Sequence, residues 1–318
     1  MRFLTILLFL FFQISLFAQP HIKDAINHYG KFDEWSVRAV EESALLGGNT
    51  RYLYEFYGDQ DTTYTQEPYK APRGYYWRTN NVMAVISGIR KTNTTIFPEK
   101  RGDGYCARIE TLIVKVKALG IINMEVVCQG AMILGALNEP IRSTSDPFAN
   151  VHCGIPYTGR PTALTFDYKA IVGNSVIKGT GFGSLKDQNY PDYAVIGVVL
   201  QKRWEDKDGN VYAQRVGTGI QRIEENVPQW VNVHKLMINY GDISKEPYYK
   251  DYMKLYTDPE RTYHTKNSKG EVVPVVENGW AAKDVQPNTL LIWFYTSCED
   301  AFYGGVGNKL WLDNVHLD

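Results

Sequence analysis

The chain has 318 residues, a formal net charge of −1 at pH 7, and 44% hydrophobic and 13% aromatic residues. Such a balance excludes a general nucleic-acid binder and a protein that adheres to anionic membranes, because both need a strongly basic surface. A chain of this length can bury one large hydrophobic core.

The first 18 residues have the pattern of a secretory signal. Arg2 precedes an apolar run from Phe3 to Phe12, and the small residue Ala18 stands just before Gln19. The run is shorter than the ~20 residues that span a bilayer, which favours removal over a retained anchor. We therefore expect no membrane span after removal, and a protein that is secreted, periplasmic or on the cell surface.

The remainder is interpreted as a short lead-in, residues 19–31, followed by one domain, residues 32–318, without linkers or internal repeats. Alternation of apolar and polar residues predicts strands throughout this domain. The clearest predicted strands are residues 108–117, 163–170, 193–204, 231–240, 289–295 and 309–317. An Asp208-Gly209 pair between two alternating runs predicts a hairpin.

The only helix expected is a short one at residues 247–256, where Tyr249, Tyr252, Met253 and Tyr256 recur with helical spacing. It lies in a polar insertion, residues 244–286, that separates two predicted strands. Many short strands with turn residues between them indicate an all-β jelly-roll sandwich with a short helical insertion.

Four cysteines follow the signal, and none comes directly after its apolar run to take a lipid. Cys106, Cys128, Cys153 and Cys298 could form disulfides in an exported chain, by any of three full pairings, or remain buried thiols. Neither alternative is favoured by the sequence. Their spacing does not match a zinc site.

No motif of a common enzyme class occurs, neither a nucleophile elbow nor a phosphate-binding or dinucleotide-binding loop. Glycoside hydrolysis would need two carboxylates about 5–10 Å apart. Glu110, Asp167 and Asp192 lie in or beside predicted strands and could pair through space. An isolated carboxylate on a strand is more often a solvated surface residue.

Six segments occur in an order that resembles a known family. They are Phe32–Trp35, Tyr76–Asn80, Ala107–Thr111, Gly154–Pro161, Asp192–Ile196 and Gly304–Val315. The chain is similar over nearly its whole length after the signal to the secreted bacterial "putative carbohydrate metabolism domain" (PCMD) family. The resemblance implies a β-jelly-roll related to galactose-binding-like carbohydrate modules, and an extracytoplasmic role with glycans. Departures are Asp33 in place of Glu, Asn308 in place of Ser, and the longer insertion.

Sugars are bound by aromatic rings that stack on their C–H faces and by polar side chains that hold their hydroxyls. The ring candidates are Trp77, Tyr157, Tyr168 and Trp204, and the hydroxyl-binding candidates are Asn80, Arg160, Lys169 and Asp192. Tyr168 and Lys169 point to opposite faces of one strand, so only one can serve the site. Lys169 shares its face with Asp167, where Arg160 could join them. The alternatives are core packing for each tryptophan and a surface turn for Arg160.

Jelly-roll carbohydrate modules often tie their termini together with a structural calcium. Asp33 or Glu34 near the start and Asp313 in the last strand could supply oxygen ligands for it. The alternative is that Asp313 faces solvent on an edge strand.

The sequence thus favours an extracytoplasmic jelly-roll that binds a polysaccharide or oligosaccharide without catalysis, as part of glycan capture. A glycoside hydrolase or lyase with an unrecognised carboxylate pair, such as one that includes Glu110 or Asp192, is the first alternative. A structural or adhesive surface protein with the same fold is the second.

Overall fold

The computed structural model describes residues 21–57, 61–118, 122–143, 145, 148–181 and 183–318. The expected signal, residues 1–18, lies outside the described residues. The described part is almost entirely β-structure, which confirms the predicted all-β sandwich. Among the described residues, no helix is both long enough and apolar enough to cross a bilayer.

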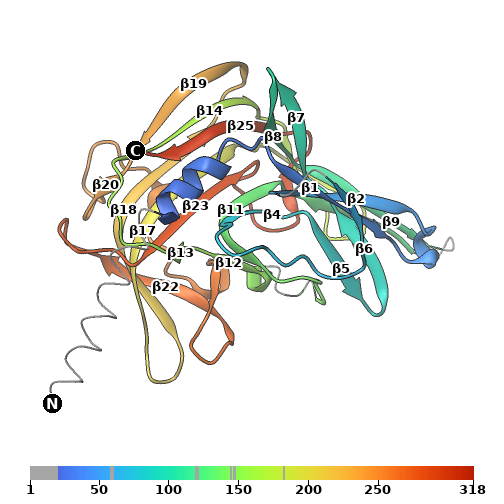
Figure 1. Ribbon diagram of the computed structural model, residues 1–318, viewed down its shortest axis with the longest axis horizontal. Coiled ribbons are helices and arrows are strands. Elements are labelled where there is room, and N and C mark those ends of the chain that lie inside the picture. Colours follow the sequence, from blue (N-terminus) through green and yellow to red (C-terminus); the bar gives the residue numbers. More distant parts are fainter. Residues whose placement is uncertain (1–20, 58–60, 119–121, 144, 146–147, 182) are drawn as a thin grey trace.

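Two sheets pack face to face to form the sandwich (Figure 1). The first is a five-stranded antiparallel sheet with the order β19 (Val227–Met237), β14 (Ala163–Ile171), β25 (Lys309–Leu317), β8 (Gly104–Glu110) and β7 (Ile96–Arg101). The facing sheet contains β4 (Trp77–Thr79), β11 (Ala131–Leu137), β23 (Thr289–Tyr295), β17 (Ala194–Glu205) and β18 (Val211–Ile223). Short strands β13 (Ile155–Pro156) and β20 (Asn239–Tyr240) extend the facing sheet.

The core forms where the alternating apolar residues of both sheets meet. Phe166 from β14 and Phe294 from β23 contact edge to face, with ring centroids 5.5 Å apart. Because side chains alternate along a strand, burying Phe166 and Tyr168 directs Asp167 and Lys169 to the outer face of the five-stranded sheet.

The residues interpreted as a lead-in form a helix, residues 21–29, that the sequence analysis missed. The helix lies beside β25 (Figure 1), where Asn27 Oδ1 accepts a hydrogen bond from the Leu317 amide at 2.8 Å. Ile26 is fully buried, and its carbonyl accepts a hydrogen bond from Trp77 Nε1 at 3.0 Å. This segment is therefore part of the core.

The prediction of a helix at residues 247–256 was wrong. Only a 3₁₀ turn, η3 (Asp251–Met253), forms there, because the backbone bonds close over three residues, as from the Met253 amide to the Lys250 carbonyl at 2.8 Å. Tyr252 and Tyr256 instead pack against the outer face of the second sheet.

The insertion covers that outer face. It contains η4 (Pro259–Arg261), β21 (His264–Lys266) and β22 (Val272–Trp280). β22 pairs with β18, β21 pairs with β22, and β12 (Val151–Cys153) connects β21 to β11. Since β11 also pairs with β23, these strands and β17 close into a ring.

A fully buried ion pair holds the insertion to the sheet inside this ring. Arg215 of β18 and Glu277 of β22 are both 0% exposed, and Arg215 Nε donates to Glu277 Oε1 at 2.7 Å. Gln201 Nε2 donates to the same oxygen at 2.5 Å, and the Tyr256 amide donates to Oε2 at 2.8 Å. The pair therefore ties the backbone of the insertion to the sandwich.

Smaller units flank the sandwich. β1 (Trp35–Glu41), β2 (Thr50–Phe56), β3 (Thr62–Tyr64) and η1 (Ala44–Leu46) build a lobe at one end, with hairpins β5 (Val82–Ile86)–β6 (Ile89–Asn93) and β9 (Leu112–Ala118)–β10 (Ile122–Cys128) (Figure 1). A further sheet contains β15 (Ser175–Lys178), β16 (Lys186–Pro191) and β24 (Tyr303–Gly305), and η2 (Phe148–Asn150) precedes β12. All four cysteines, which lie in the described part, are free thiols.

We predict that breaking the buried ion pair loosens the insertion. Glu277→Gln leaves the Arg215 charge without a counter-ion, which should lower the free energy of unfolding by about 3–5 kcal/mol. The double variant Arg215→Met/Glu277→Leu, which removes both charges, should recover much of this loss. Urea unfolding measures the free energy of unfolding of both variants. A Glu277→Gln protein as stable as the native protein would contradict the role assigned to the ion pair.

Candidate functional site

The outer face of the five-stranded sheet collects charged and aromatic side chains from all five strands. Asp167 stands directly opposite Asp313 across β14 and β25, and Lys169 stands opposite Trp311. Trp311 in turn stands opposite Arg108 of β8. We call this surface the charged face; its members are Glu99, Arg101, Arg108, Glu110, Asp167, Lys169, Trp230, Trp311 and Asp313.

Arg101 is the centre of the charged face. Its Nη2 lies 2.9 Å from Asp167 Oδ2 and its Nη1 lies 2.6 Å from Asp313 Oδ2, so one guanidinium joins both carboxylates. The guanidinium carbon is 3.8 Å from the centroid of the Trp230 ring. Arg101 therefore fixes an indole and two acids relative to one another.

The two bridged acids differ in protonation behaviour. Burial raises the pKa of Asp167, but hydrogen bonds from Asn314, Val233 and Arg101 outweigh it and hold the pKa below its usual value. Burial also raises the pKa of Asp313, and here the hydrogen bond from Arg101 does not compensate fully, so the pKa lies above its usual value.

Lys169 lies near both indoles of the charged face, Trp230 beside Arg101 and Trp311 beside Glu99. Its Nζ lies 4.3 Å from the ring centroid of Trp311 and 5.5 Å from that of Trp230. Glu99 Oε1 accepts a hydrogen bond from Trp311 Nε1 at 2.9 Å, and Glu99 Oε2 lies 2.9 Å from Arg108 Nε. Both indoles are thus held in place by ionic neighbours.

A cavity of about 430 Å³ opens at the Asp167 end of the charged face. It is lined by Asn27, Lys31, Asp167, Val233, Asn314 and His316. Asp167 belongs both to this cavity and to the Arg101 cluster, so the cavity continues the charged face toward the N-terminal helix.

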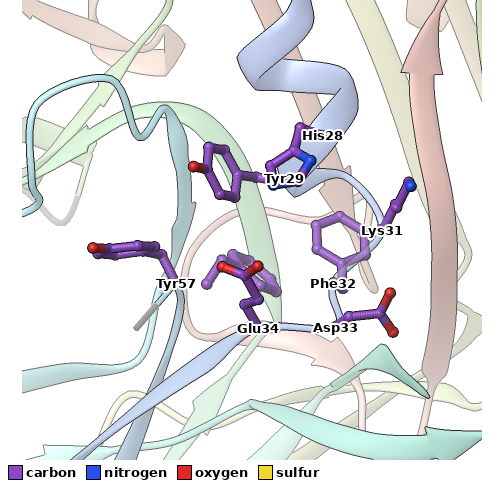
Figure 2. A pocket seen from close by; sticks show the side chains of 8 residues that line it. His28, Tyr29, Lys31, Phe32, Asp33, Glu34 and Tyr57 are labelled. Atoms are coloured by element: carbon purple, nitrogen blue, oxygen red, sulfur yellow. The ribbon is translucent and has the colours of Figure 1, made fainter. Parts of the chain in front are cut away.

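A second pocket, of about 170 Å³, shares Lys31 with that cavity. Figure 2 shows the rings of Tyr29 and Tyr57 and the carboxylate of Glu34 turned toward the same space, with Asp33 pointing away. Tyr29 Oη donates to Tyr75 Oη at 3.0 Å, which fixes one of these rings. The cavity thus shares Asp167 with the charged face, and this tyrosine pocket shares Lys31 with the cavity.

Two residues of the tyrosine pocket have a positive φ, as do Val233 and Asn314 of the adjoining cavity. Phe32 has φ 51° and Tyr57 has φ 122°, and both line the tyrosine pocket. Such conformations cost roughly 1–3 kcal/mol each for residues other than glycine and persist only where neighbours impose them. Here the Tyr57 amide donates to the Glu34 carbonyl at 3.1 Å. The pocket is held in one shape.

The structure places three of the ring candidates and one of the hydroxyl-binding candidates in the interior. Trp77 is 2% exposed, and Tyr157 and Tyr168 are also buried, so none can stack on a ligand. Asp192 is fully buried and accepts hydrogen bonds from the amides of Gly305 at 2.6 Å and Cys298 at 3.1 Å. Its role is to fasten loops.

Two other candidates hold backbone in place elsewhere. Asn80 Nδ2 donates to the Gln129 carbonyl at 2.7 Å. Arg160 Nη1 donates to the Val285 carbonyl at 2.6 Å, and its guanidinium lies 4.1 Å from the Tyr240 ring, so it does not join Lys169. Trp204 is 40% exposed but stacks on Tyr212 in the β17–β18 hairpin.

Of the eight ring and hydroxyl-binding candidates, Lys169 alone reaches the charged face, where it lies beside Asp167. The residues that sequence reasoning missed are Glu99, Arg101, Trp230, Trp311, Tyr29 and Tyr57. Trp311 could have been found, because it lies two residues before Asp313 in a predicted strand and so shares its face. Arg101 and Trp230 reach the face only through the strand order, which spacing does not give.

The expected calcium ligands do not fit a calcium site as they stand. Asp313 is paired with Arg101, whose guanidinium takes the place beside the carboxylate that a cation would need. Asp33 Oδ1 accepts a hydrogen bond from the Tyr105 amide at 3.0 Å, while Glu34 turns toward the tyrosines (Figure 2). Among the described residues, the one group of three metal-binding side chains with ligand atoms within 4.8 Å of one another is Asp192, Cys298 and Glu299.

Comparison with known proteins gives a family match and a structural likeness. The family model described as "Putative carbohydrate metabolism domain" matches residues 32–318. No curated protein matches the chain. A solved structure titled a putative glycoside hydrolase from Bacteroides thetaiotaomicron VPI-5482 is 16% identical, with a TM-score of 0.47, over 85% of this chain and 81% of that chain. Another so titled, from Bacteroides vulgatus ATCC 8482, is 17% identical, with a TM-score of 0.45, over 79% and 95%.

We predict that Arg101→Met destabilises the protein most near neutral pH. Without the guanidinium, Asp167 and Asp313 face each other as two carboxylates, which should lower the free energy of unfolding by about 2–4 kcal/mol at pH 7. The deficit should shrink toward pH 4, because protonation of one acid removes the repulsion. Thermal unfolding across this range measures the change.

The matched control is Lys235→Met, which removes a more exposed ion pair with Asp318. It should change stability by less than about 1 kcal/mol. An Arg101→Met deficit that is no larger than this, or that grows on acidification, would contradict the assigned role of Arg101.

Proposed function

The chain belongs to the Putative carbohydrate metabolism domain family, and from this premise we propose that it binds a polysaccharide or oligosaccharide, without catalysis, through the charged face. One observation carries the proposal: the outer face of one sheet gathers seven ionic side chains and the partly exposed indole of Trp230 from five strands, while the Trp311 indole is buried among them. Stacked rings and charged hydrogen-bonding groups are the combination that holds a sugar's C–H face and its hydroxyls.

The ionic partners support binding over chemistry. Glu99 is paired with Arg108 and Lys169, and Glu110 with Arg108 and Lys309. Carboxylates held by cations in this way are preorganised acceptors for sugar hydroxyls, and they need not rearrange when a ligand arrives. The half-buried Trp230 ring keeps part of its surface open beside them.

The adjoining cavity and tyrosine pocket support an extended ligand. A chain of sugar units lying along the charged face would meet the cavity at Asp167 and then the rings of Tyr29 and Tyr57. Several linked subsites raise affinity by effective concentration, so a polymer should bind more tightly than a monosaccharide.

A glycoside hydrolase is the second candidate, and one observation favours it. Asp167 and Asp313 face each other across two strands, their pKa values are shifted in opposite directions, and Asp167 lines the 430 Å³ cavity. Divergent pKa values in a carboxyl pair are the usual basis of an acid and base assignment. Arg101, which lies between them, would have to yield its place to substrate.

We predict that Trp230→Ala and Lys169→Ala each weaken glycan binding about tenfold or more, since central aromatic and charged anchors dominate binding energy. A glycan array identifies the ligand, and calorimetry with it gives the dissociation constants. Trp204→Ala, which removes an exposed ring on the β17–β18 hairpin, is the matched control and should bind like the native protein. An equal loss of affinity in all three variants, or no loss in any of them, would contradict the charged face as the binding site.

The same glycan distinguishes capture from hydrolysis. Non-catalytic capture predicts no new reducing ends after prolonged incubation with the native protein. Reducing ends that disappear in both Asp167→Asn and Asp313→Asn would instead support the hydrolase.

We also propose that the protein acts outside the cytoplasm, on the strength of the signal pattern in residues 1–18. Expression in its native host should give a mature chain that begins at Gln19, as read by N-terminal sequencing. A cytoplasmic product that retains Met1 would contradict export.

A further inference from the structure

A third pocket lies in the lobe and shares no lining residue with the charged face. Its volume is about 210 Å³, between β2, β4 and the segment that follows β11. The side chains that matter for its chemistry are Glu55, Tyr69, Arg78, Thr79, Glu139 and Lys266.

Its two carboxyl groups are held very differently. Glu139 is fully engaged, because it lies 2.9 Å from Arg38 Nη1 and accepts hydrogen bonds from the amides of Met83 and Tyr69 at 2.5 Å. Glu55 Oε2 accepts a hydrogen bond from Thr79 Oγ1 at 3.1 Å, but its Oε1 lies 3.7 Å from Arg38, too far for a hydrogen bond. Glu55 is therefore the carboxyl group with capacity left for a ligand.

Glu55 is a neutral hydrogen-bond donor near pH 7. Its burial raises its pKa to about 8, and the nearby charge of Glu139 adds to this rise. Arg38, Thr79 and Arg78 act in the opposite direction but do not cancel it. The other titratable groups that line the pocket are Glu139, Arg78, Lys266 and Tyr69, whose pKa burial raises to about 12.

With Glu55 uncharged, the surroundings carry an excess of positive charge. The charges of Arg38 and Glu139 cancel in their ion pair, which leaves Arg78 and Lys266 without an acid of their own in the pocket. Backbone carbonyls of Trp77 and Tyr75 hold the Arg78 guanidinium, at 2.6 and 2.7 Å. The pocket is therefore prepared for an anion.

Tyr69 supplies a second, independent sign of a ligand. Two guanidiniums lie over its ring, with the guanidinium carbon 5.3 Å from the ring centroid for Arg38 and 5.9 Å for Arg78. Its Oη is buried and has no hydrogen-bond partner among the described residues. Folded proteins rarely leave a buried hydroxyl unpaired, so an unpaired one that lines a cavity points to a missing partner.

We propose that this pocket binds a small hydroxylated monoanion, a sugar acid such as a hexuronate, whose carboxylate lies between Arg78, the Tyr69 hydroxyl and the Glu55 carboxyl. The remaining space of the 210 Å³ pocket would hold its hydroxyls beside Asn138 and Lys266. The anion meets the excess positive charge, and Glu55 and Tyr69 both donate hydrogen bonds to it. This site is separate from the charged face and does not rest on the function proposed for that face.

Calorimetry of the full mature chain with sodium glucuronate and sodium galacturonate at pH 6.5 tests the proposal. At least one should bind with millimolar affinity or better, and glucose and acetate should bind at least tenfold more weakly. Tyr69→Phe should weaken binding about tenfold without lowering the melting temperature, because the removed hydroxyl has no partner to lose. Absence of binding by both uronates, or equal binding of acetate, overturns the inference.

Trp230→Ala separates this proposal from that of the charged face. It should leave uronate binding unchanged. Uronate binding that is lost in Trp230→Ala and kept in Tyr69→Phe would mean that the ligand occupies the charged face and that the present inference is wrong.

The protonation of Glu55 gives a second test. Uronate binding should weaken as the pH rises from 7 to 9, because ionised Glu55 repels the ligand, and Glu55→Gln should remove this dependence. Binding to the native protein that is independent of pH in this range contradicts the role of Glu55 as a donor.

We predict a matching effect on stability. A raised pKa in the folded state means that Glu55 contributes stability fully below its ordinary pKa of 4.5, and that this contribution is lost as the pH rises through about 8. Glu55→Gln should therefore gain melting temperature relative to the native protein between pH 5 and pH 9. Glu42→Gln is the opposite control, because burial of Glu42 is outweighed by Lys91 and Thr92, which lower its pKa.

Discussion

The contact between Phe166 and Phe294 across the sandwich sets the direction of every side chain on β14. Because successive residues of a strand point to opposite sides, an inward Phe166 requires Asp167 to point outward. β25 pairs with β14, β8 pairs with β25, and both repeat the alternation, so their polar residues lie on the same outer surface. The charged face is thus a consequence of how the core is buried.

Ion pairing then determines how rigid that surface is. Arg101 joins Asp167 and Asp313, and the charges of the surface are mostly neutralised by one another, in part across strands that are not adjacent. Pairs of this kind add little net stability, yet removing one member leaves an uncompensated charge. The same holds for Arg215 and Glu277, the buried pair that joins the insertion to the second sheet. Both clusters hold elements from distant parts of the sequence in fixed positions.

Local sequence patterns predicted the strands well and the site only in part. The strands predicted at residues 289–295 and 309–317 match β23 and β25, whereas the segment 108–117 divides at Thr111 into β8 and β9. Alternation also placed Lys169 beside Asp167. Alternation left open whether Trp77 is buried. Its burial depends on the N-terminal helix, which the sequence analysis did not predict and whose Ile26 carbonyl accepts a hydrogen bond from the Trp77 indole. Nor could alternation bring Arg101 and Trp230 to the face, which depends on the spatial order of five strands.

Binding at the charged face is the central claim, and the indole N–H resonances of the tryptophans test it most directly. In a protein labelled with ¹⁵N-tryptophan, titration with the bound glycan should shift the resonances of Trp230 and Trp311. The resonance of Trp204, on the β17–β18 hairpin, should stay in place. A titration that moves Trp204 and leaves Trp230 and Trp311 unchanged would contradict the account.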